Sequence, residues 1–137
     1  MKRKLWQVVG FLAALLAAST AVGQTKRGDT IADIPFAFTV SNHTLPPGRY
    51  TVTRLSEKAL RIFNSQNRGT FALTNKVEGK APESGKMVFH RYGNAYFLYE
   101  VWVSGSRIGR KVLQSRSEKE LVGRQTEMKI AELQTAR

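Results

Sequence analysis

The residues best suited to binding a ligand lie in one stretch of the chain, between 86 and 103. Five of them form the candidate ligand-binding set: His90, Arg91, Tyr96, Glu100 and Trp102. Guanidinium and carboxylate groups make charge-assisted hydrogen bonds, and exposed Tyr and Trp rings stack on sugars or bases. The sequence therefore predicts a binding site in this stretch and leaves the identity of the ligand open.

Catalysis and metal binding have little support. His43 and His90 are the only histidines and there is no Cys, whereas a metal site usually needs three or more ligands with organised surroundings. No second carboxylate is expected beside Glu100, as paired-carboxylate catalysis would require, and no Gly-x-Ser-x-Gly elbow occurs. We predict no catalytic residue, no metal site and no cofactor.

A β-hairpin must position the candidate set. The strings KMVFHRY and AYFLYEVWV flank Gly93-Asn94, and a two-residue loop that begins with Gly suits a type II′ turn. Pairing across this turn places Met87 opposite Glu100. Both faces of the hairpin are rich in apolar residues, so we expect both to be covered.

Glu100 falls in the middle of a strand, where a carboxylate needs a charged or hydrogen-bonding partner. Arg91 is on the same predicted face but four positions away, which is too far for contact. We expect Glu100 to reach Arg54 or Arg61 from another strand, or to face water near the end of the sheet. The face of Glu100 also carries Arg91, Tyr96 and Trp102, and the opposite face carries His90.

The rest of the central region also alternates as strands do. Strands are expected over 33–40, 49–55, 59–63 and 70–77, in addition to the two strands of the hairpin. Short strands at this spacing predict an all-β, mainly antiparallel fold, either a small β-sandwich or a β-barrel. A barrel would have an interior that suits a small apolar ligand, lined by Phe36, Phe38, Phe89 and Leu98.

The two ends of the chain differ from this β domain. Lys2, Arg3 and Lys4 precede an apolar run and then small residues, which predicts a secretory signal over 1–23 with cleavage between Gly23 and Gln24. A retained membrane anchor is the alternative. Ser115 and Ser117 each precede a Glu by three positions, which indicates a capped, marginal and charged helix. The expected organisation is a signal over 1–23, a flexible lead-in over 24–32, the β domain over 33–114 and a helical tail over 115–137.

The chain is strongly basic. Its 137 residues include 22 Lys and Arg against 10 Asp and Glu, a net charge of +12. Loss of the signal leaves 19 basic and 10 acidic side chains, a net charge of +9. Such a surface favours anionic polymers and anionic lipid head groups. We therefore expect an exported protein, periplasmic or extracellular, that is not an enzyme. Its expected role is binding or structural and associated with the cell envelope, with no specific nucleic-acid partner. The alternative is a carrier of a small apolar ligand.

Four short motifs carry a resemblance. They are DIPFxFxV from Asp33, LPxGxYxV from Leu45, VFHRYG from Val88 and VW at Val101. Together they resemble a group of small exported β-rich proteins from environmental bacteria, over residues 33 to about 121. That group has no established activity, so the resemblance implies a shared fold and export and transfers no functional residue.

Overall fold

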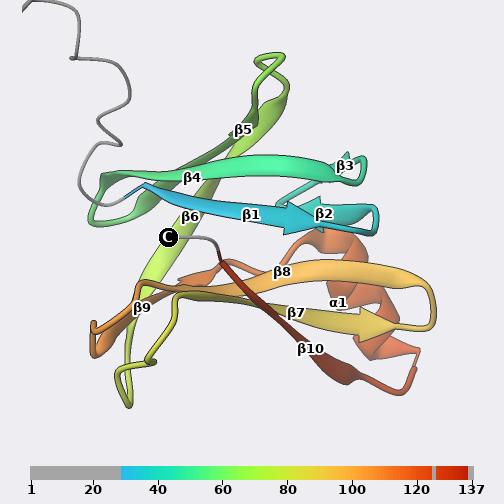
Figure 1. Ribbon diagram of the computed structural model, residues 1–137. Coiled ribbons are helices and arrows are strands. Elements are labelled where there is room, and N and C mark those ends of the chain that lie inside the picture. The colour runs from blue at the N-terminus through green and yellow to red at the C-terminus, as the bar shows by residue number, and fades with distance from the viewer. Residues whose placement is uncertain (1–28, 125, 136–137) are drawn as a thin grey trace, which may run out of the picture.

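The computed structural model describes residues 29–124 and 126–135 (Figure 1). They form ten strands and one short helix, which confirms the predicted all-β, mainly antiparallel class. The elements are β1 (Thr30–Ile34), β2 (Phe38–Val40), β3 (His43–Leu45), β4 (Gly48–Ser56), β5 (Ala59–Asn64), β6 (Gly69–Glu78), β7 (Lys86–Tyr92), β8 (Ala95–Trp102), β9 (Ile108–Val112), α1 (Arg116–Gly123) and β10 (Lys129–Gln134).

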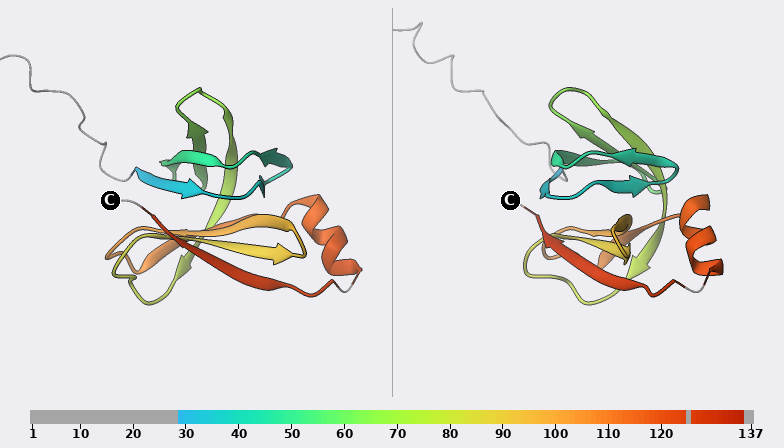
Figure 2. Two further views of the ribbon diagram at one scale, coloured as in Figure 1. Left: turned by 45° about the vertical axis from the view of Figure 1, so that its right-hand side comes forward. Right: turned by 90° about the vertical axis from the view of Figure 1, so that its right-hand side faces the viewer.

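The strands form one open sheet that folds into two facing layers. The order is β1-β4-β5-β6-β9-β8-β2-β3, with β7 on β8 and β10 on β7. The long strand β6 pairs with β5 at its start and β9 at its end, and so passes from the upper layer to the lower one (Figures 1 and 2). Within the described residues β1, β3 and β10 end the sheet without pairing with one another. The alternative of a closed barrel is therefore wrong.

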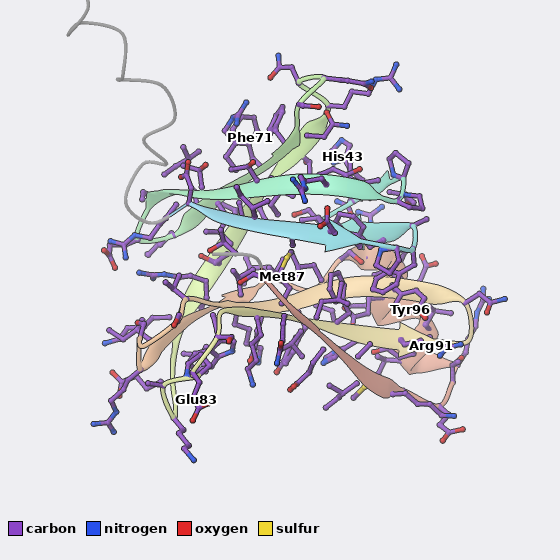
Figure 3. The ribbon with its side chains drawn as sticks, in the orientation of Figure 1. His43, Phe71, Glu83, Met87, Arg91 and Tyr96 are labelled. Carbon is purple, nitrogen blue, oxygen red and sulfur yellow. The ribbon has the colours of Figure 1, made fainter. Side chains whose placement is uncertain are left out.

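The core lies between the two layers. Alternate residues of the strands point into it, among them Phe38, Tyr50 and Phe89, which are almost completely buried. Phe36 and Phe38 each contact the Phe89 ring edge-on, with centroids 5.1 and 5.8 Å apart, and Leu98 belongs to the same cluster. The four residues expected to line a hollow interior instead pack together, because an inter-layer core fills with side chains. Figure 3 shows Met87 pointing into this space and Phe71 pointing away from the upper layer.

The N-terminal strand differs from the expectation in two ways. The single strand predicted over 33–40 is divided into β1 and β2, with Pro35 just after β1, because Pro has no N–H to donate to a ladder. Residues 30–32, expected in a flexible lead-in, belong to β1 and pair with Tyr50, Thr51 and Val52 of β4. The lead-in prediction is wrong for these residues, whereas β4, β5 and β6 confirm the strands predicted over 49–55, 59–63 and 70–77.

The C-terminal region is a helix followed by a strand. Ser115 caps α1, and its hydroxyl accepts a hydrogen bond from the backbone N–H of Glu118 at 3.1 Å, as the capping pattern predicted. The helix ends at Gly123, and β10 then pairs antiparallel with β7 along its whole length. A helical tail over 115–137 is therefore wrong beyond α1. Pairing satisfies backbone groups that β7 would otherwise expose at an edge.

The predicted signal segment 1–23, its cleavage site at Gly23 and Gln24, and the first residues of the lead-in lie outside the described residues. In the described part of the chain, no helix has the length and apolar character needed to cross a membrane.

Candidate functional site

The β7–β8 hairpin turns where the sequence predicted, but its register changes beyond the tip. Gly93 has a positive φ of 60°, and Arg91 pairs with Tyr96 as expected. The pairing then shifts at a bulge opposite Val88 and Phe89, where Tyr99 of β8 is the extra residue, so Val88 lies opposite Glu100. The predicted pairing of Met87 with Glu100 is wrong by one residue.

The bulge changes which residues share a face. An extra residue in one strand reverses the alternation beyond it. Leu98 and Val101, three positions apart, therefore both belong to the inter-layer core cluster. Glu100 and Trp102 move to the outer face of the lower layer, the face of His90, and Arg91 and Tyr96 remain on the other face. The candidate set is therefore divided between two faces, with His90, Glu100 and Trp102 on one and Arg91 and Tyr96 on the other. Regular alternation had predicted His90 alone on one face and the other four together.

Arg91 and Tyr96 form a pair of their own near the hairpin tip (Figure 3). The Arg91 guanidinium carbon lies 5.4 Å from the Tyr96 ring centroid, and its Nε donates to the Gly93 carbonyl at 2.7 Å. The Tyr96 ring stacks on Phe36 with centroids 3.7 Å apart. These contacts pack Tyr96 against the rim of the core and place both residues apart from His90.

Glu100 and Trp102 contact each other. The indole Nε1 of Trp102 donates to Glu100 Oε2 at 2.7 Å. Of the two predicted alternatives for Glu100, the one in which it reaches Arg54 or Arg61 is therefore wrong. Trp102 is buried, and its ring covers Gly109, where an added Cβ would lie only 2.6 Å from the ring. This indole fills space in the fold and offers no free face for stacking.

His90 joins a buried carboxylate on α1. Its Nδ1 lies 2.9 Å from Glu118 Oε2, and the Tyr92 hydroxyl donates to the same oxygen at 2.8 Å. Glu118 is only 3% exposed. Its position in the first turn of α1 also favours a negative charge, because the N-terminal end of a helix carries a partial positive charge. The hydrogen bonds from His90 and Tyr92 to Glu118 therefore hold α1 against the lower layer.

Tyr92 is a neutral hydrogen-bond donor in this cluster. Burial raises the pKa of its phenol to about 12, and the hydrogen bond to the Glu118 carboxylate raises it in the same direction. The phenol therefore keeps its proton at physiological pH and continues to donate to Glu118 Oε2.

Tyr99 and Lys111 extend the cluster towards the surface. The Tyr99 ring stacks on the His90 imidazole with centroids 3.9 Å apart, and Lys111 Nζ lies 5.1 Å from the Tyr99 centroid. Lys111 is exposed, and no carboxylate of the described residues forms an ion pair with it. A stacked imidazole and phenol thus lie beside an exposed ammonium group.

These residues line a groove on the outer face of the lower layer, beside α1. Its volume is about 440 Å³, within the range of ligand sites. We call it the outer groove; its polar lining residues are Asn75, His90, Tyr99, Lys111, Gln114 and Glu118. Among the described residues, no group of three or more His, Cys, Asp or Glu could hold a metal ion. The groove is therefore suited to hydrogen bonding and ion pairing.

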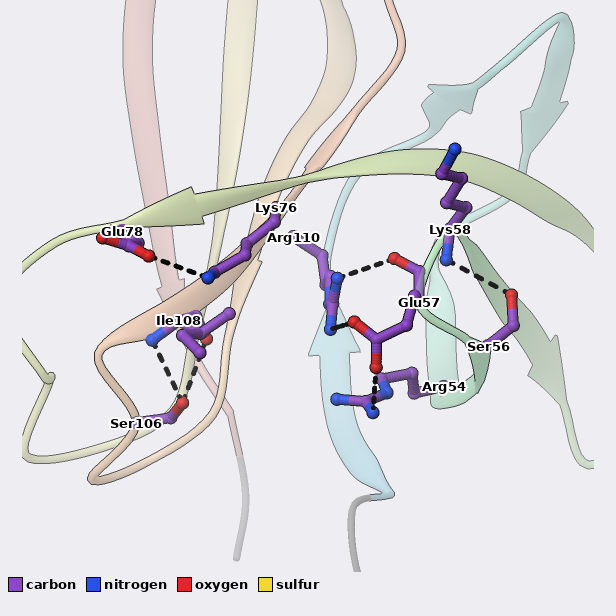
Figure 4. Close-up of polar contacts among 9 residues, drawn as sticks. All are labelled: Arg54, Ser56, Glu57, Lys58, Lys76, Glu78, Ser106, Ile108 and Arg110. Atoms are coloured by element: carbon purple, nitrogen blue, oxygen red, sulfur yellow. Dashed lines mark hydrogen bonds and ion pairs between the residues drawn. The ribbon is translucent and has the colours of Figure 1, made fainter.

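A second cavity lies between the two layers, at the end where β4 turns into β5. Its volume is about 640 Å³. We call it the inter-layer cleft; its lining residues include Val52, Leu60, Val101, Val103, Ile108, Arg54 and Arg110. Figure 4 shows the ion pairs at this end, where Arg54 and Arg110 both contact Glu57.

Of the five residues in the candidate set, only His90 lines the outer groove. Tyr99, Lys111 and Glu118 also line it but were not predicted as site residues. Glu118 was recognised only as part of a capping pattern. The Glu118 side chain is available to bond His90 and Tyr92 of β7, because the Ser115 hydroxyl caps the helix without it. A signal did exist, since His90 and Tyr92 are two apart on one strand and so present two hydrogen-bonding groups on one face.

Comparisons with protein-family models, curated proteins and solved structures gave no match to the chain. The resemblance noted from the turn and strand motifs therefore stays a prediction.

Proposed function

We propose that this chain is an exported, non-enzymatic β module of the cell envelope that binds an acidic polysaccharide through the outer groove. The observation that carries the proposal is Lys111, an exposed ammonium group without a carboxylate partner among the described residues, held beside the stacked Tyr99 and His90 rings. Such a group attracts a sugar carboxylate, sulfate or phosphate.

The neighbouring groups suit a sugar. Asn75 and Gln114 supply amide groups that both donate and accept hydrogen bonds, as hydroxyl groups require. Lys111 lies opposite Asn75 of β6 and opposite Glu100 of β8, so it has an amide and a carboxylate as neighbours on one face. Glu100 Oε2 accepts a hydrogen bond from the Trp102 indole and makes no ion pair with Lys111. Glu118, the carboxylate of the groove, already accepts hydrogen bonds from His90 and Tyr92. The arrangement therefore favours one acidic sugar unit held by the Lys111 cation and the neutral polar groups.

The excess of positive charge supports a polymer in preference to an isolated sugar. A net charge of +9 after loss of the signal attracts a polyanion over the whole surface, and the groove supplies the specific contact. A polar, concave groove also fits a sugar chain better than a flat layer of lipid head groups. Binding to anionic vesicles in preference to a glycan would contradict the proposal.

A retention experiment tests this function. The chain from Gln24 onward is passed over immobilised polygalacturonate and, separately, over neutral dextran. We expect retention on polygalacturonate alone, weakening steadily as salt rises, because ion pairs with a polyanion release counterions. Retention that is equal on both resins, or unchanged by salt, would refute the proposal.

Two matched variants separate the groove from general charge. Lys111→Gln and Lys58→Gln each remove one exposed positive charge, but Lys58 lies in the β4–β5 turn, away from the outer groove. We expect Lys111→Gln to weaken binding about tenfold, the effect of losing one charge-assisted hydrogen bond, and Lys58→Gln to weaken it much less. Equal effects would mean that net charge alone drives binding.

Export has its own test. The full chain is expressed with its own N-terminus in a bacterium with two membranes, and the mass of the product is measured after cell fractionation. We expect a product in the periplasm or medium that begins at Gln24. An intact chain in the membrane fraction would favour the retained anchor instead.

A further inference from the structure

The inter-layer cleft has apolar walls contributed by both layers. Val52 and Leu60 come from the upper layer, and Val101 and Ile108 come from the lower layer. Ile108 is 42% exposed, and so is Val103 beside it at 43%. The core therefore continues to the surface at this end of the molecule, and apolar side chains remain uncovered there.

Two guanidinium groups line the same cleft. The Arg110 side chain is 9% exposed and donates from Nη1 to the Glu57 carbonyl at 2.7 Å and from Nη2 to Glu57 Oε2 at 3.2 Å. Arg54 donates from Nη2 to Glu57 Oε1 at 2.8 Å. A guanidinium has five N–H donors, and in the described residues these two make no other side-chain hydrogen bonds. The other N–H groups of the two guanidiniums have no acceptor among the described residues, and those of Arg54, whose side chain is 54% exposed, are accessible to a ligand.

The rim of the cleft is close to neutral. Asp29 also lines the cleft, so Asp29 and Glu57 together offset Arg54 and Arg110. Net charge does not select an anion here. The N–H groups that Glu57 leaves unpaired select the anion, chiefly those of the more exposed Arg54, because guanidinium N–H groups bond well to the oxygens of a carboxylate or phosphate.

We propose that the inter-layer cleft binds a single-chain amphiphile with an anionic head group, such as a fatty acid. Its acyl chain lies against Val101, Val103 and Ile108, and its head accepts hydrogen bonds from Arg54 and Arg110. A volume of about 640 Å³ accommodates one such molecule. This site is separate from the outer groove and does not depend on the function proposed for that groove.

Calorimetric titration with decanoate, hexanoate and decanol tests the proposal, on the chain from Gln24 onward and below the concentration at which micelles form. We expect saturable binding of one decanoate. Hexanoate should bind more weakly because it buries fewer CH₂ groups, and decanol should bind more weakly because it lacks the anionic head. Equal affinity for decanoate and decanol would overturn the role of the arginines, and failure of decanoate to bind would overturn the site.

Variants locate the binding. Arg54→Met should weaken decanoate binding about tenfold, the effect of losing a hydrogen bond to a charged group. Its control is Arg61→Met, because Arg61 lies on the outer face of the same β4–β5 hairpin, opposite Thr53. Asp29→Asn should strengthen binding, since it removes a negative charge from the rim. Equal losses in Arg54→Met and Arg61→Met, or weaker binding by Asp29→Asn, would refute the assignment.

The outer groove and the inter-layer cleft can be tested independently of each other. Lys111→Gln should leave decanoate binding unchanged, and Arg54→Met should reduce retention on polygalacturonate no more than Lys58→Gln does. Inositol hexakisphosphate, an anion without an acyl chain, should not compete with decanoate. Competition by that anion would show a general phosphate site in place of an amphiphile site.

Discussion

Two carboxylates of this protein are each shared by two side chains, in opposite surroundings. Glu118 accepts hydrogen bonds from His90 and Tyr92 beneath α1, and it is 3% exposed. Glu57 bridges Arg54 and Arg110 at the turn between β4 and β5, where its own side chain is 72% exposed (Figure 4). The number of partners is the same, and the access of water differs.

This difference decides how each cluster contributes to the protein. A buried polar group that loses its partner cannot turn to water, so the loss is costly. An exposed ion pair is replaced by water and screened by salt. We infer that Glu118 holds the architecture of the outer groove, whereas Glu57 mainly positions two guanidiniums that remain able to bind a ligand.

The largest expected effect comes from Glu118→Ala. It leaves the Nδ1 of His90 and the hydroxyl of Tyr92 without their shared acceptor, and it detaches α1 from the lower layer. We expect the free energy of unfolding to fall by about 3 kcal/mol, measured by urea denaturation. The matched control is Glu120→Ala, two residues along the same helix and exposed, where we expect a change within about 0.5 kcal/mol. Equal losses in the two variants would remove the distinction between buried and exposed carboxylates.

Alkaline pH tests the same cluster without a substitution. Burial raises the pKa of Tyr92 from 10.0 to about 12, and burial also raises the pKa of Tyr50. Between these values the unfolded chain has lost a proton that the folded chain retains, so stability is complete below pH 10 and falls as pH rises towards 12. The slope of unfolding free energy against pH should become shallower in Tyr92→Phe, with Tyr50 supplying the remainder. An unchanged slope would show that Tyr92 is not responsible.

The fold and the site were predictable to different degrees. The turn at Gly93-Asn94 and the pairing of His90 with Phe97 followed from local sequence, because a two-residue loop fixes the register of the strands next to it. The bulge at Tyr99, opposite Val88 and Phe89, did not follow, because nothing in the apolar sequence of β8 marks which residue is the extra one. Beyond the bulge, the faces of Glu100 and Trp102 were therefore assigned wrongly.

The C-terminal region shows a second limit. Residues 129–134 gave no strand signal because their apolar residues, Ile130, Ala131 and Leu133, do not alternate. They form β10 because β7 presents a free edge. The partnership of His90 with Glu118 likewise joins residues 28 positions apart. Both depend on which elements the fold brings together, which spacing along one chain does not reveal.

A third polar group sharpens the comparison, because it is buried and has no partner. Among the described residues, the Thr74 hydroxyl is the buried side-chain polar atom that makes no hydrogen bond. Thr74→Val replaces it with a methyl group of similar shape, so we expect the free energy of unfolding to rise by about 1 kcal/mol. Thr70→Val is the control, since the Thr70 hydroxyl is bonded to His43 Nδ1 at 3.3 Å. The free energy of unfolding should not rise in Thr70→Val. If it falls in Thr74→Val, the Thr74 hydroxyl has a hydrogen-bond partner and the prediction is wrong.

The smallest expected effect on stability comes from Glu57→Gln, although it removes the negative charge that two arginines share. Hydrogen bonding to Arg110 lowers the pKa of Glu57, and the charge of Arg54 lowers it further. The stability from this pair is therefore present above the ordinary value of 4.5 and is lost as pH falls below it. Because the carboxylate is exposed, we expect a change in the urea midpoint well below that of Glu118→Ala, disappearing at high salt. The same substitution should strengthen decanoate binding, since it removes a negative charge that competes with the head group for both guanidiniums. A loss of stability as large as that of Glu118→Ala would mean that the partly buried Arg110, and not the exposure of Glu57, decides the energy of this cluster.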